Sequence, residues 1–240
     1  YKEKALRYGL IDLKEGECIT DHIDLISVHL PYRRMGEKAL AYLLRHEWRN
    51  LPRWKEVINE VRVEEPSPKD PRGTIESILA DTEFMKADEK FRRLFMQTAL
   101  YHESYEKKMA SSLKASELIG NLYTASMYMG FRSSLEFEYK RGTDLDGKRV
   151  GFRSYGSGSS AMVFSGVIQP YYKEIDAAMN LEEEIGSRMK LSMEEYEGLH
   201  RGIGRELFDS INHSNKEFVL IKIGGKSTDK AGLREYAYSV

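Results

Sequence analysis

The sequence predicts a mixed α/β fold, and three observations support this prediction. The run "DLISVHL" (24–30) is short, mostly apolar and bounded by Asp and Pro, which is typical of a buried strand. Residues 147–169 place a Gly/Ser-rich turn between two runs with the pattern of strands, and so predict a strand, a turn and a second strand. Apolar residues at helical spacing fill residues 35–48 and 82–114 between these strands.

The remaining elements are predicted from the same patterns. Residues 64–73 hold three of the six prolines and are the clearest loop. A helix follows the Gly120-Asn121 break, and the C-terminal strands are predicted to be antiparallel neighbours. The other predicted elements are helices over 1–15, 171–188 and 192–207, and strands over 217–225 and 234–240.

Composition excludes several classes of function. The 240 residues carry a net charge of −1, so no basic field favours nonspecific nucleic-acid binding. No apolar run approaches the roughly 18 residues that span a membrane. A charged N-terminus argues against a signal peptide. The single cysteine excludes an intramolecular disulfide and favours a reducing, cytoplasmic setting. Because the chain starts with Tyr1, we interpret it as a piece of a longer product or a processed chain.

His29 ends the first predicted strand and is followed by Pro31 and a basic cluster. One interpretation is a strand-end histidine satisfied by a backbone carbonyl. The other is a reacting group, because α/β folds place such groups at the carboxyl ends of strands. Arg34 and Lys38 are four residues apart and share a face at the start of the next helix. They suit a phosphate there, or form a solvated surface pair.

Two further stretches have both a functional and a structural interpretation. "RSYGSGSS" (153–160) suits an anion-binding or oxyanion turn, or a tight hairpin. Asn121 either caps the following helix or points its amide at a ligand carbonyl. Cys18 lies in a polar stretch without the helix-start context that lowers a thiol pKa, so we do not expect a nucleophile there. The other histidines show no metal-ligand spacing, and no metal site is predicted.

Four stretches, taken together and in order, carry a family resemblance. They are "VHLPYRRMGEKAL", "GNLYTASMYMGFRSSL", "GKRVGFRSYGSGSSAMVFSGVI" and "RMKLSMEEYEGL". This series resembles the C-terminal part of hydroxymethylglutaryl-CoA synthase over most of the chain, and is weakest over 51–77 and after His213. The resemblance implies a thiolase-like layered αβαβα architecture, of which residues 1–240 are the C-terminal half.

The resemblance also implies a reaction. The family is an acyltransferase that condenses acetyl-CoA with acetoacetyl-CoA to give 3-hydroxy-3-methylglutaryl-CoA and CoA, in the mevalonate route to isoprenoids. An acetyl group is loaded on a cysteine, and its methyl carbon attacks the ketone of acetoacetyl-CoA. The resulting thioester is then hydrolysed. No cofactor is needed beyond the CoA thioester substrates.

Site residues follow from the matched motifs. His29 matches the histidine that holds the acetoacetyl group, and Arg34 and Lys38 fall on positions that contact CoA phosphates. The family usually has Lys where this chain has Arg34; Arg keeps the charge with a planar fork. Three residues match substrate-binding positions: Asn121, Tyr123 and Ser157.

The family's nucleophilic cysteine and acid/base glutamate lie in an N-terminal half that these 240 residues do not contain. We therefore expect a partner chain or a further part of the same polypeptide, an oligomeric assembly, and no activity without that half. Two alternatives stay open. One is a non-catalytic CoA-binding scaffold subunit of a thiolase-like complex. The other is a polyketide β-branching synthase that acts on carrier-protein acyl groups.

Overall fold

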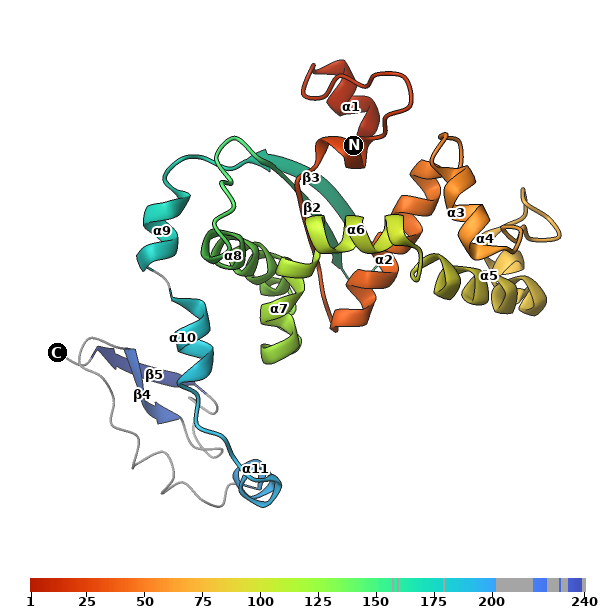
Figure 1. Ribbon diagram of the computed structural model, residues 1–240. Helices are drawn as coiled ribbons and strands as arrows, with labels where there is room; N and C mark the ends of the chain where they lie inside the picture. Colours follow the sequence, from red (N-terminus) through yellow and green to blue (C-terminus); the bar gives the residue numbers. More distant parts are fainter. Residues whose placement is uncertain are drawn as a thin grey trace. The chain divides into compact units, whose positions relative to one another are not determined.

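The computed structural model describes residues 1–156, 158, 160–178, 180–201, 218–223, 229 and 233–238. The chain forms two compact units, Tyr1–Ser187 and Arg188–Val240. Figure 1 shows the order of the elements along the chain.

A three-stranded mixed sheet forms the centre of the first unit. Strand β1 (Leu25–Val28) runs parallel to β2 (Arg149–Gly156), which pairs antiparallel with β3 (Ser160–Val167). The strand order is β1-β2-β3, and Val28 lies opposite Arg153. The predicted strand at 24–30 and the predicted hairpin at 147–169 are therefore confirmed.

Strand alternation divides the hydrophobic core between the two faces of the sheet. Ile26 and Val28 belong to a core cluster that also contains residues of α2, α5 and α6. Leu25 belongs to a second cluster, built with residues of α8 and β2. Because successive side chains of a strand point to opposite faces, Leu25, Ser27 and His29 share the α8 side of the sheet. The sheet is thus covered by helices on both faces.

Helices fill most of the first unit. Their bounds are α1 (Lys2–Arg7), the 3-10 helix η1 (Ile19–His22), α2 (Arg33–Trp48), α3 (Trp54–Val61), α4 (Ile75–Ala80), α5 (Thr82–Phe95), α6 (Ala99–Lys108), α7 (Ala110–Ile119), α8 (Ala125–Lys140), α9 (Tyr172–Ala178) and α10 (Leu181–Gly186). Figure 1 shows α8 and α9 on one side of the sheet and α2 to α5 on the other.

The prediction of one long helix over 82–114 was wrong. The segment forms three helices, α5, α6 and α7. The Thr98 hydroxyl accepts from the backbone N–H of Tyr101 and caps α6, so the chain changes direction there. Phe91, Phe95 and Met109 are nevertheless buried, as the apolar stripe predicts.

Two other predictions of helices need correction, and two helices were missed. The helix expected over 1–15 is only α1, because Gly9 with φ +63° follows it in a left-handed conformation. The helix expected over 171–188 is divided into α9 and α10. Helices α3 and α4 lie within or beside the segment of weakest resemblance and were not predicted.

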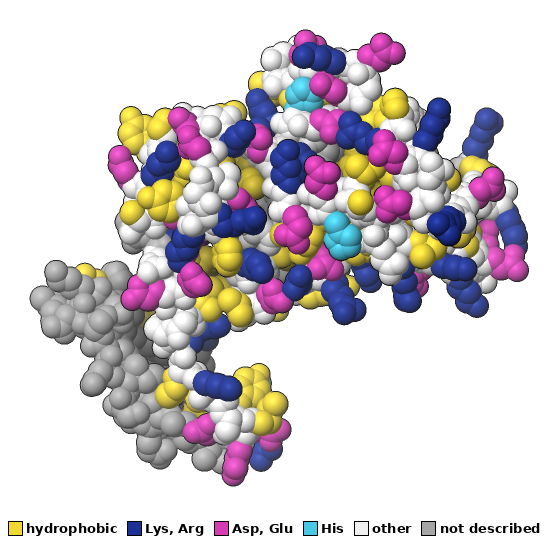
Figure 2. Space-filling view, in the orientation of Figure 1, with side chains coloured by type: hydrophobic (Ala, Val, Ile, Leu, Met, Phe, Trp, Pro, Cys, Tyr) yellow, Lys and Arg dark blue, Asp and Glu magenta, His cyan; other side chains and the backbone are white. Residues whose placement is uncertain are grey.

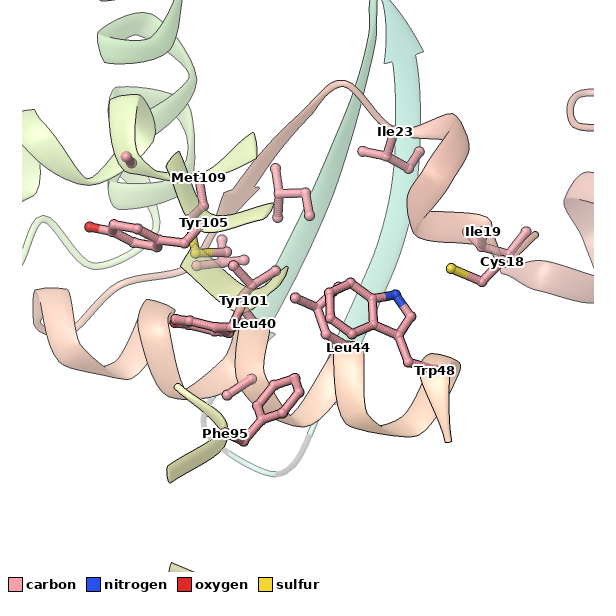
Figure 3. Packing of buried hydrophobic residues seen from close by; sticks show 14 of the residues in the cluster. Cys18, Ile19, Ile23, Leu40, Leu44, Trp48, Phe95, Tyr101, Tyr105 and Met109 are labelled. Carbon is pink, nitrogen blue, oxygen red and sulfur yellow. The ribbon is translucent and has the colours of Figure 1, made fainter. Parts of the chain in front are cut away.

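The larger core is rich in aromatic rings where α2, α5 and α6 meet. Leu40, Leu44 and Trp48 of α2 lie on the side of that helix that faces Phe95 and Tyr101 (Figure 3). The centroid of the Phe95 ring lies 6.0 Å from that of Trp48 and 5.6 Å from that of Tyr101, and both pairs pack edge to face. This packing holds α5 and α6 against α2.

A buried ion cluster also joins α2 to α5. Arg45 has a side chain only 4% exposed and donates at 2.9 Å to both Asp88 and Glu65. Its guanidinium lies over the Phe91 ring at 4.8 Å. A buried charge is tolerated only when it is paired, so this cluster fixes where α5 lies along α2.

The second unit has its own strand pair. Helix α11 (Met193–His200) is capped by Ser192, whose hydroxyl accepts from the N–H of Glu195. Strands β4 (Phe218–Ile223) and β5 (Arg234–Tyr238) pair antiparallel, as predicted. The helix expected over 192–207 ends at His200 in the described part, and the rest of that prediction lies outside it. None of the helices in the described ranges is both long and apolar enough to cross a membrane.

Candidate functional site

His29 lies one residue beyond β1 and is half-buried. Its backbone N–H donates to the carbonyl of Arg153 at 2.9 Å, which extends the β1–β2 ladder by one bond. This contact brings the histidine motif next to the strand that enters the glycine-rich turn. The next residue, Leu30, is buried in the larger core, on the face of the sheet opposite His29, and holds the chain there.

Ser126 connects His29 to the "GNLYTAS" stretch. Its side chain is fully buried, and its Oγ lies 3.2 Å from Nδ1 of His29. The same oxygen accepts from the N–H of Leu30 at 3.0 Å and donates to the carbonyl of Tyr123 at 2.8 Å. Sequence reasoning did not single out Ser126. Its position at the start of a predicted helix, five residues after Asn121, was the only available signal.

Asn121 and Tyr123 form the turn that leads into α8. The Asn121 side-chain oxygen accepts from the N–H of Tyr123 at 2.8 Å, which is an Asx turn. Thr124 rather than Asn121 is the N-cap of α8, so the capping interpretation of Asn121 was wrong. Tyr123 has φ +50° and is 75% exposed. A left-handed non-glycine residue is strained, and such residues cluster at functional sites.

The glycine-rich turn joins β2 to β3. Ser157 lies outside the described residues, so its predicted role has no structural account here. The strands on both sides are well defined, with Tyr155 opposite Ala161 and Gly156 opposite Ser160. Burial lowers the pKa of the Arg153 guanidinium just before this turn.

Arg34 and Lys38 line an open groove of about 540 Å³ between α2 and α5. The groove is also lined by Arg92 and Arg93, which sequence reasoning missed because they lie about 55 residues further along the chain. Arg93 is paired with Glu89 at 2.6 Å. In contrast, Arg34 and Lys38 form no ion pair with any described residue, although Lys38, after Arg93 and Arg92, helps to lower the pKa of the Glu89 carboxyl.

The charge of this groove is local rather than part of a basic face. Four basic and two acidic side chains line it: Arg34, Lys38, Arg92, Arg93, Glu37 and Glu89. Elsewhere, basic and acidic side chains are interspersed over the face shown in Figure 2. An excess of unpaired cations in a groove is chemistry suited to a phosphorylated ligand.

Cys18 is unsuited to nucleophilic catalysis. Contrary to expectation it does lie at a helix start, as the N-cap of η1. Burial, followed by the nearby carboxylates of Glu47 and Asp21, nevertheless raises the pKa of the thiol to about 12. The Sγ–H donates to Asp21 at 3.3 Å, so the thiol is protonated and occupied at neutral pH. In the part of the chain with described side chains, no cluster of three or more His, Cys, Asp or Glu residues suits a metal ion.

The structure thus gathers the predicted residues into two groups. At the carboxyl end of β1, Ser126 contacts His29 and bonds the backbone carbonyl of Tyr123, and Asn121 bonds the backbone N–H of Tyr123. Arg34 and Lys38 share the groove on α2. The first group presents an imidazole and an Asx turn, which suit a small polar ligand. The second presents cations, which suit an anion.

This mixed sheet, covered by helices on both faces and carrying a histidine at the end of its first strand, has a thiolase-like fold. The family model "Hydroxymethylglutaryl-coenzyme A synthase C terminal" matches residues 1–215. The chain belongs to this family.

Individual relatives agree with the family. The hydroxymethylglutaryl-CoA synthase of Saccharomyces cerevisiae is 30% identical over 194 residues, covering 77% of this chain and 35% of the yeast protein. The polyketide biosynthesis 3-hydroxy-3-methylglutaryl-ACP synthase PksG of Bacillus subtilis is 28% identical over 117 residues, covering 49% of this chain and 27% of that protein.

A solved structure extends the match to the whole chain. The structure described as MvaS in complex with 3-hydroxy-3-methylglutaryl coenzyme A is 27% identical, with a TM-score of 0.62. It covers 100% of this chain and 47% of the MvaS chain. The chain therefore spans less than half the length of these relatives.

Proposed function

We propose that this chain supplies the acetoacetyl- and CoA-binding half of a hydroxymethylglutaryl-CoA synthase. The reaction is the condensation of acetyl-CoA with acetoacetyl-CoA to 3-hydroxy-3-methylglutaryl-CoA. The observation that carries the proposal is a series of hydrogen bonds at the end of β1. Ser126 contacts His29 and bonds the Tyr123 carbonyl, and Asn121 bonds the Tyr123 N–H. The family match over residues 1–215 supports it.

In this proposal His29 acts on the ketone of acetoacetyl-CoA. The acid/base glutamate of the other half removes a proton from the methyl carbon of the cysteine-bound acetyl group. That carbon then forms a bond to the ketone carbon, and the carbonyl electron pair moves onto oxygen. A hydrogen bond from His29 to that oxygen stabilises the developing charge. Asn121 and Tyr123 orient the acyl chain, with Ser157 contributing from the glycine-rich turn. Water then hydrolyses the cysteine thioester and frees the product.

Arg34 and Lys38 bind the phosphates of CoA. Neither forms an ion pair with a described carboxylate, and Arg93, which is paired with Glu89, adds a third exposed cation to the same groove. The phosphates and the thioester lie at opposite ends of a CoA thioester. A phosphate groove separate from the histidine cluster is therefore expected.

The acetyl-bearing cysteine and the acid/base glutamate come from a second half. The chain covers only 47% of the MvaS chain, which supports the existence of a further half of similar size. The edge strand β3 exposes Met162, Val163 and Val167 in the described unit. An apolar edge strand is a surface that other protein covers in a stable assembly. We expect a homo- or hetero-oligomer, and no turnover by this chain alone.

The proposal includes no cofactor beyond the CoA thioesters. It also includes a reducing cytoplasmic setting, which rests on the single cysteine of the sequence, and a place in the mevalonate route to isoprenoids.

Product formation tests the proposal. The chain is combined with a cysteine-bearing N-terminal half, supplied with acetyl-CoA and acetoacetyl-CoA, and analysed by mass spectrometry for 3-hydroxy-3-methylglutaryl-CoA. Product should form with both halves present and with neither alone. Tight binding of CoA thioesters without product, in every such combination, indicates the scaffold function instead.

A second candidate is condensation on carrier proteins, which the match to PksG favours. Carrier-bound acetoacetate would then replace acetoacetyl-CoA, with the groove cations meeting phosphopantetheine or acidic carrier helices. Comparing acetoacetyl-CoA with the carrier-bound acetoacetyl substrate at equal concentration separates the candidates. Faster turnover of acetoacetyl-CoA supports the main proposal, and faster turnover of the carrier-bound donor supports the second.

A further inference from the structure

Three groups lie within hydrogen-bond distance of the Ser126 hydroxyl, which has only one proton to donate. Its Oγ lies within hydrogen-bond distance of the Leu30 N–H, the Tyr123 carbonyl and Nδ1 of His29. A serine hydroxyl has one proton to donate and two lone pairs that accept. The Leu30 N–H donates, so it occupies one lone pair. The proton must therefore go either to the Tyr123 carbonyl or to His29.

The distances decide between these two partners. The Oγ of Ser126 lies 2.8 Å from the Tyr123 carbonyl oxygen and 3.2 Å from Nδ1 of His29. Two oxygens at 2.8 Å repel unless a proton lies between them, so the serine proton points to Tyr123. The second lone pair of Ser126 then faces His29, and only a protonated Nδ1 can donate to it.

We propose that Ser126 is a positioning residue that holds His29 with Nδ1 protonated and its ring oriented for the acetoacetyl group. The inference rests on the proposed function of His29 as the group that meets the ketone. No described residue bonds the other ring nitrogen, Nε2. The ring therefore keeps Nε2 for the substrate.

This assignment sharpens the chemistry of His29. A neutral ring protonated at Nδ1 presents a lone pair at Nε2 and accepts a hydrogen bond there. The same ring donates from Nε2 to a ketone oxygen only as an imidazolium. Donation from His29 to the ketone therefore requires both ring nitrogens to be protonated, and the ring becomes neutral when its Nε2 proton passes to the developing alkoxide.

Ring-nitrogen NMR tests the proton assignment directly. The chain is labelled with ring-¹⁵N histidine, assembled with the cysteine-bearing half, and the His29 signals are assigned by their loss in His29→Ala. In the unmutated protein the neutral His29 ring should be protonated at Nδ1. Protonation at Nε2 instead would overturn the proposal, whether or not any variant folds.

Substitution tests the positioning role. Ser126→Ala should change the His29 ring signals and lower kcat/KM for acetoacetyl-CoA by roughly 10- to 100-fold. Ser133→Ala is the matched control. Ser133 is also fully buried on α8, accepts from the Ala115 N–H at 3.2 Å and donates to the Ser111 carbonyl at 2.8 Å. It loses the same kind of hydroxyl without any contact to His29.

The two variants separate positioning from general stability. Equal losses of activity in Ser126→Ala and Ser133→Ala, with unchanged His29 signals in both, would contradict the proposal. The NMR result requires no turnover. The NMR measurement can therefore be made even where the proposed condensation fails. If the inference about Ser126 fails, the unmutated protein still forms product.

Discussion

The hydroxyl of Ser27 donates to the backbone carbonyl of Met127 at 2.6 Å, and both residues are buried. This bond joins β1 to the first turn of α8 across 100 residues of sequence. Ser27 is two residues before His29, and Met127 is one after Ser126. The contact therefore sets the distance between the histidine and its buried serine partner.

Close packing of α8 on β1 predicts that Gly130→Ala is destabilising. A Cβ at Gly130 would lie 2.9 Å from Oγ of Ser27 and 3.1 Å from the carbonyl of Ser112. Overpacking outweighs the gain in helix propensity, and the free energy of unfolding should fall by roughly 1–2 kcal/mol. Chemical denaturation measures this. The control is Gly166→Ala, whose Cβ would meet no atom within 4 Å. Equal stability of the two variants would show that the contact is not tight.

The unpaired cations of the groove predict a selective effect on CoA binding. Arg34→Ala and Lys38→Ala should each raise KM for acetoacetyl-CoA roughly five- to tenfold, since each removes one charge-assisted phosphate contact. Their kcat should change little, because the groove is separate from the His29 cluster. Steady-state kinetics at low salt checks this. Lys86→Ala, an exposed change on α5 outside the groove, serves as the control, and a matching rise in its KM would argue against a phosphate site.

A substitution at Tyr123 should affect kinetics without affecting the free energy of unfolding. Glycine adopts φ +50° without strain, so Tyr123→Gly should leave the free energy of unfolding within about 1 kcal/mol of the unmutated value. The ring is 75% exposed and packs little in the described structure. Loss of the ring should nevertheless lower kcat/KM for acetoacetyl-CoA, because the proposed function places Tyr123 against the acyl chain. Unchanged kinetics would remove Tyr123 from that site.

Glu136 predicts a pH dependence of stability. Burial acts to raise the pKa of this carboxyl, but Lys140, the N–H groups of Glu182 and Leu181, and Arg132 together hold the pKa below its ordinary value of 4.5. Folding therefore favours the charged form. Its stabilising contribution is present above pH 4.5 and is lost as the pH falls through the lower pKa of the folded state.

Glu136→Gln should reveal this contribution. At neutral pH the variant should lose roughly 3 kcal/mol of unfolding free energy, because it leaves Arg132 and Lys140 underpaired around a buried position. The difference from the unmutated chain should shrink as acid is added. Glu182→Gln breaks only an exposed pair with Lys140 and should cost less than about 1 kcal/mol. A difference in unfolding free energy for Glu136→Gln that grows towards low pH would contradict a lowered pKa of Glu136 in the folded state.

Local patterns predicted most of the first unit's architecture. The apolar run at 24–30 and the alternation around the glycine-rich turn became β1, β2 and β3. The break at Met96 to Thr98 was missed, because the apolar period continues across it from Phe95 to Tyr101. Periodicity reports which residues are buried but not where a helix turns.

The candidate site was predicted unevenly for a related reason. His29, Arg34 and Lys38 belong to one continuous motif and could be recognised along the sequence. Ser126 lies 97 residues from His29, and a serine among small helical residues resembles ordinary packing. Its role follows from three distances, which sequence alone does not contain.

The most direct test of the central claim is the condensation rate of His29→Ala. The chain, assembled with the cysteine-bearing half, is assayed for CoA release from acetyl-CoA and acetoacetyl-CoA. We predict that His29→Ala lowers kcat/KM for acetoacetyl-CoA by roughly 10²- to 10³-fold. His22→Ala, which removes an imidazole that bonds Glu17 before β1, should leave the rate unchanged. Undiminished CoA release by His29→Ala would contradict the assignment of this chain as the acetoacetyl-binding half.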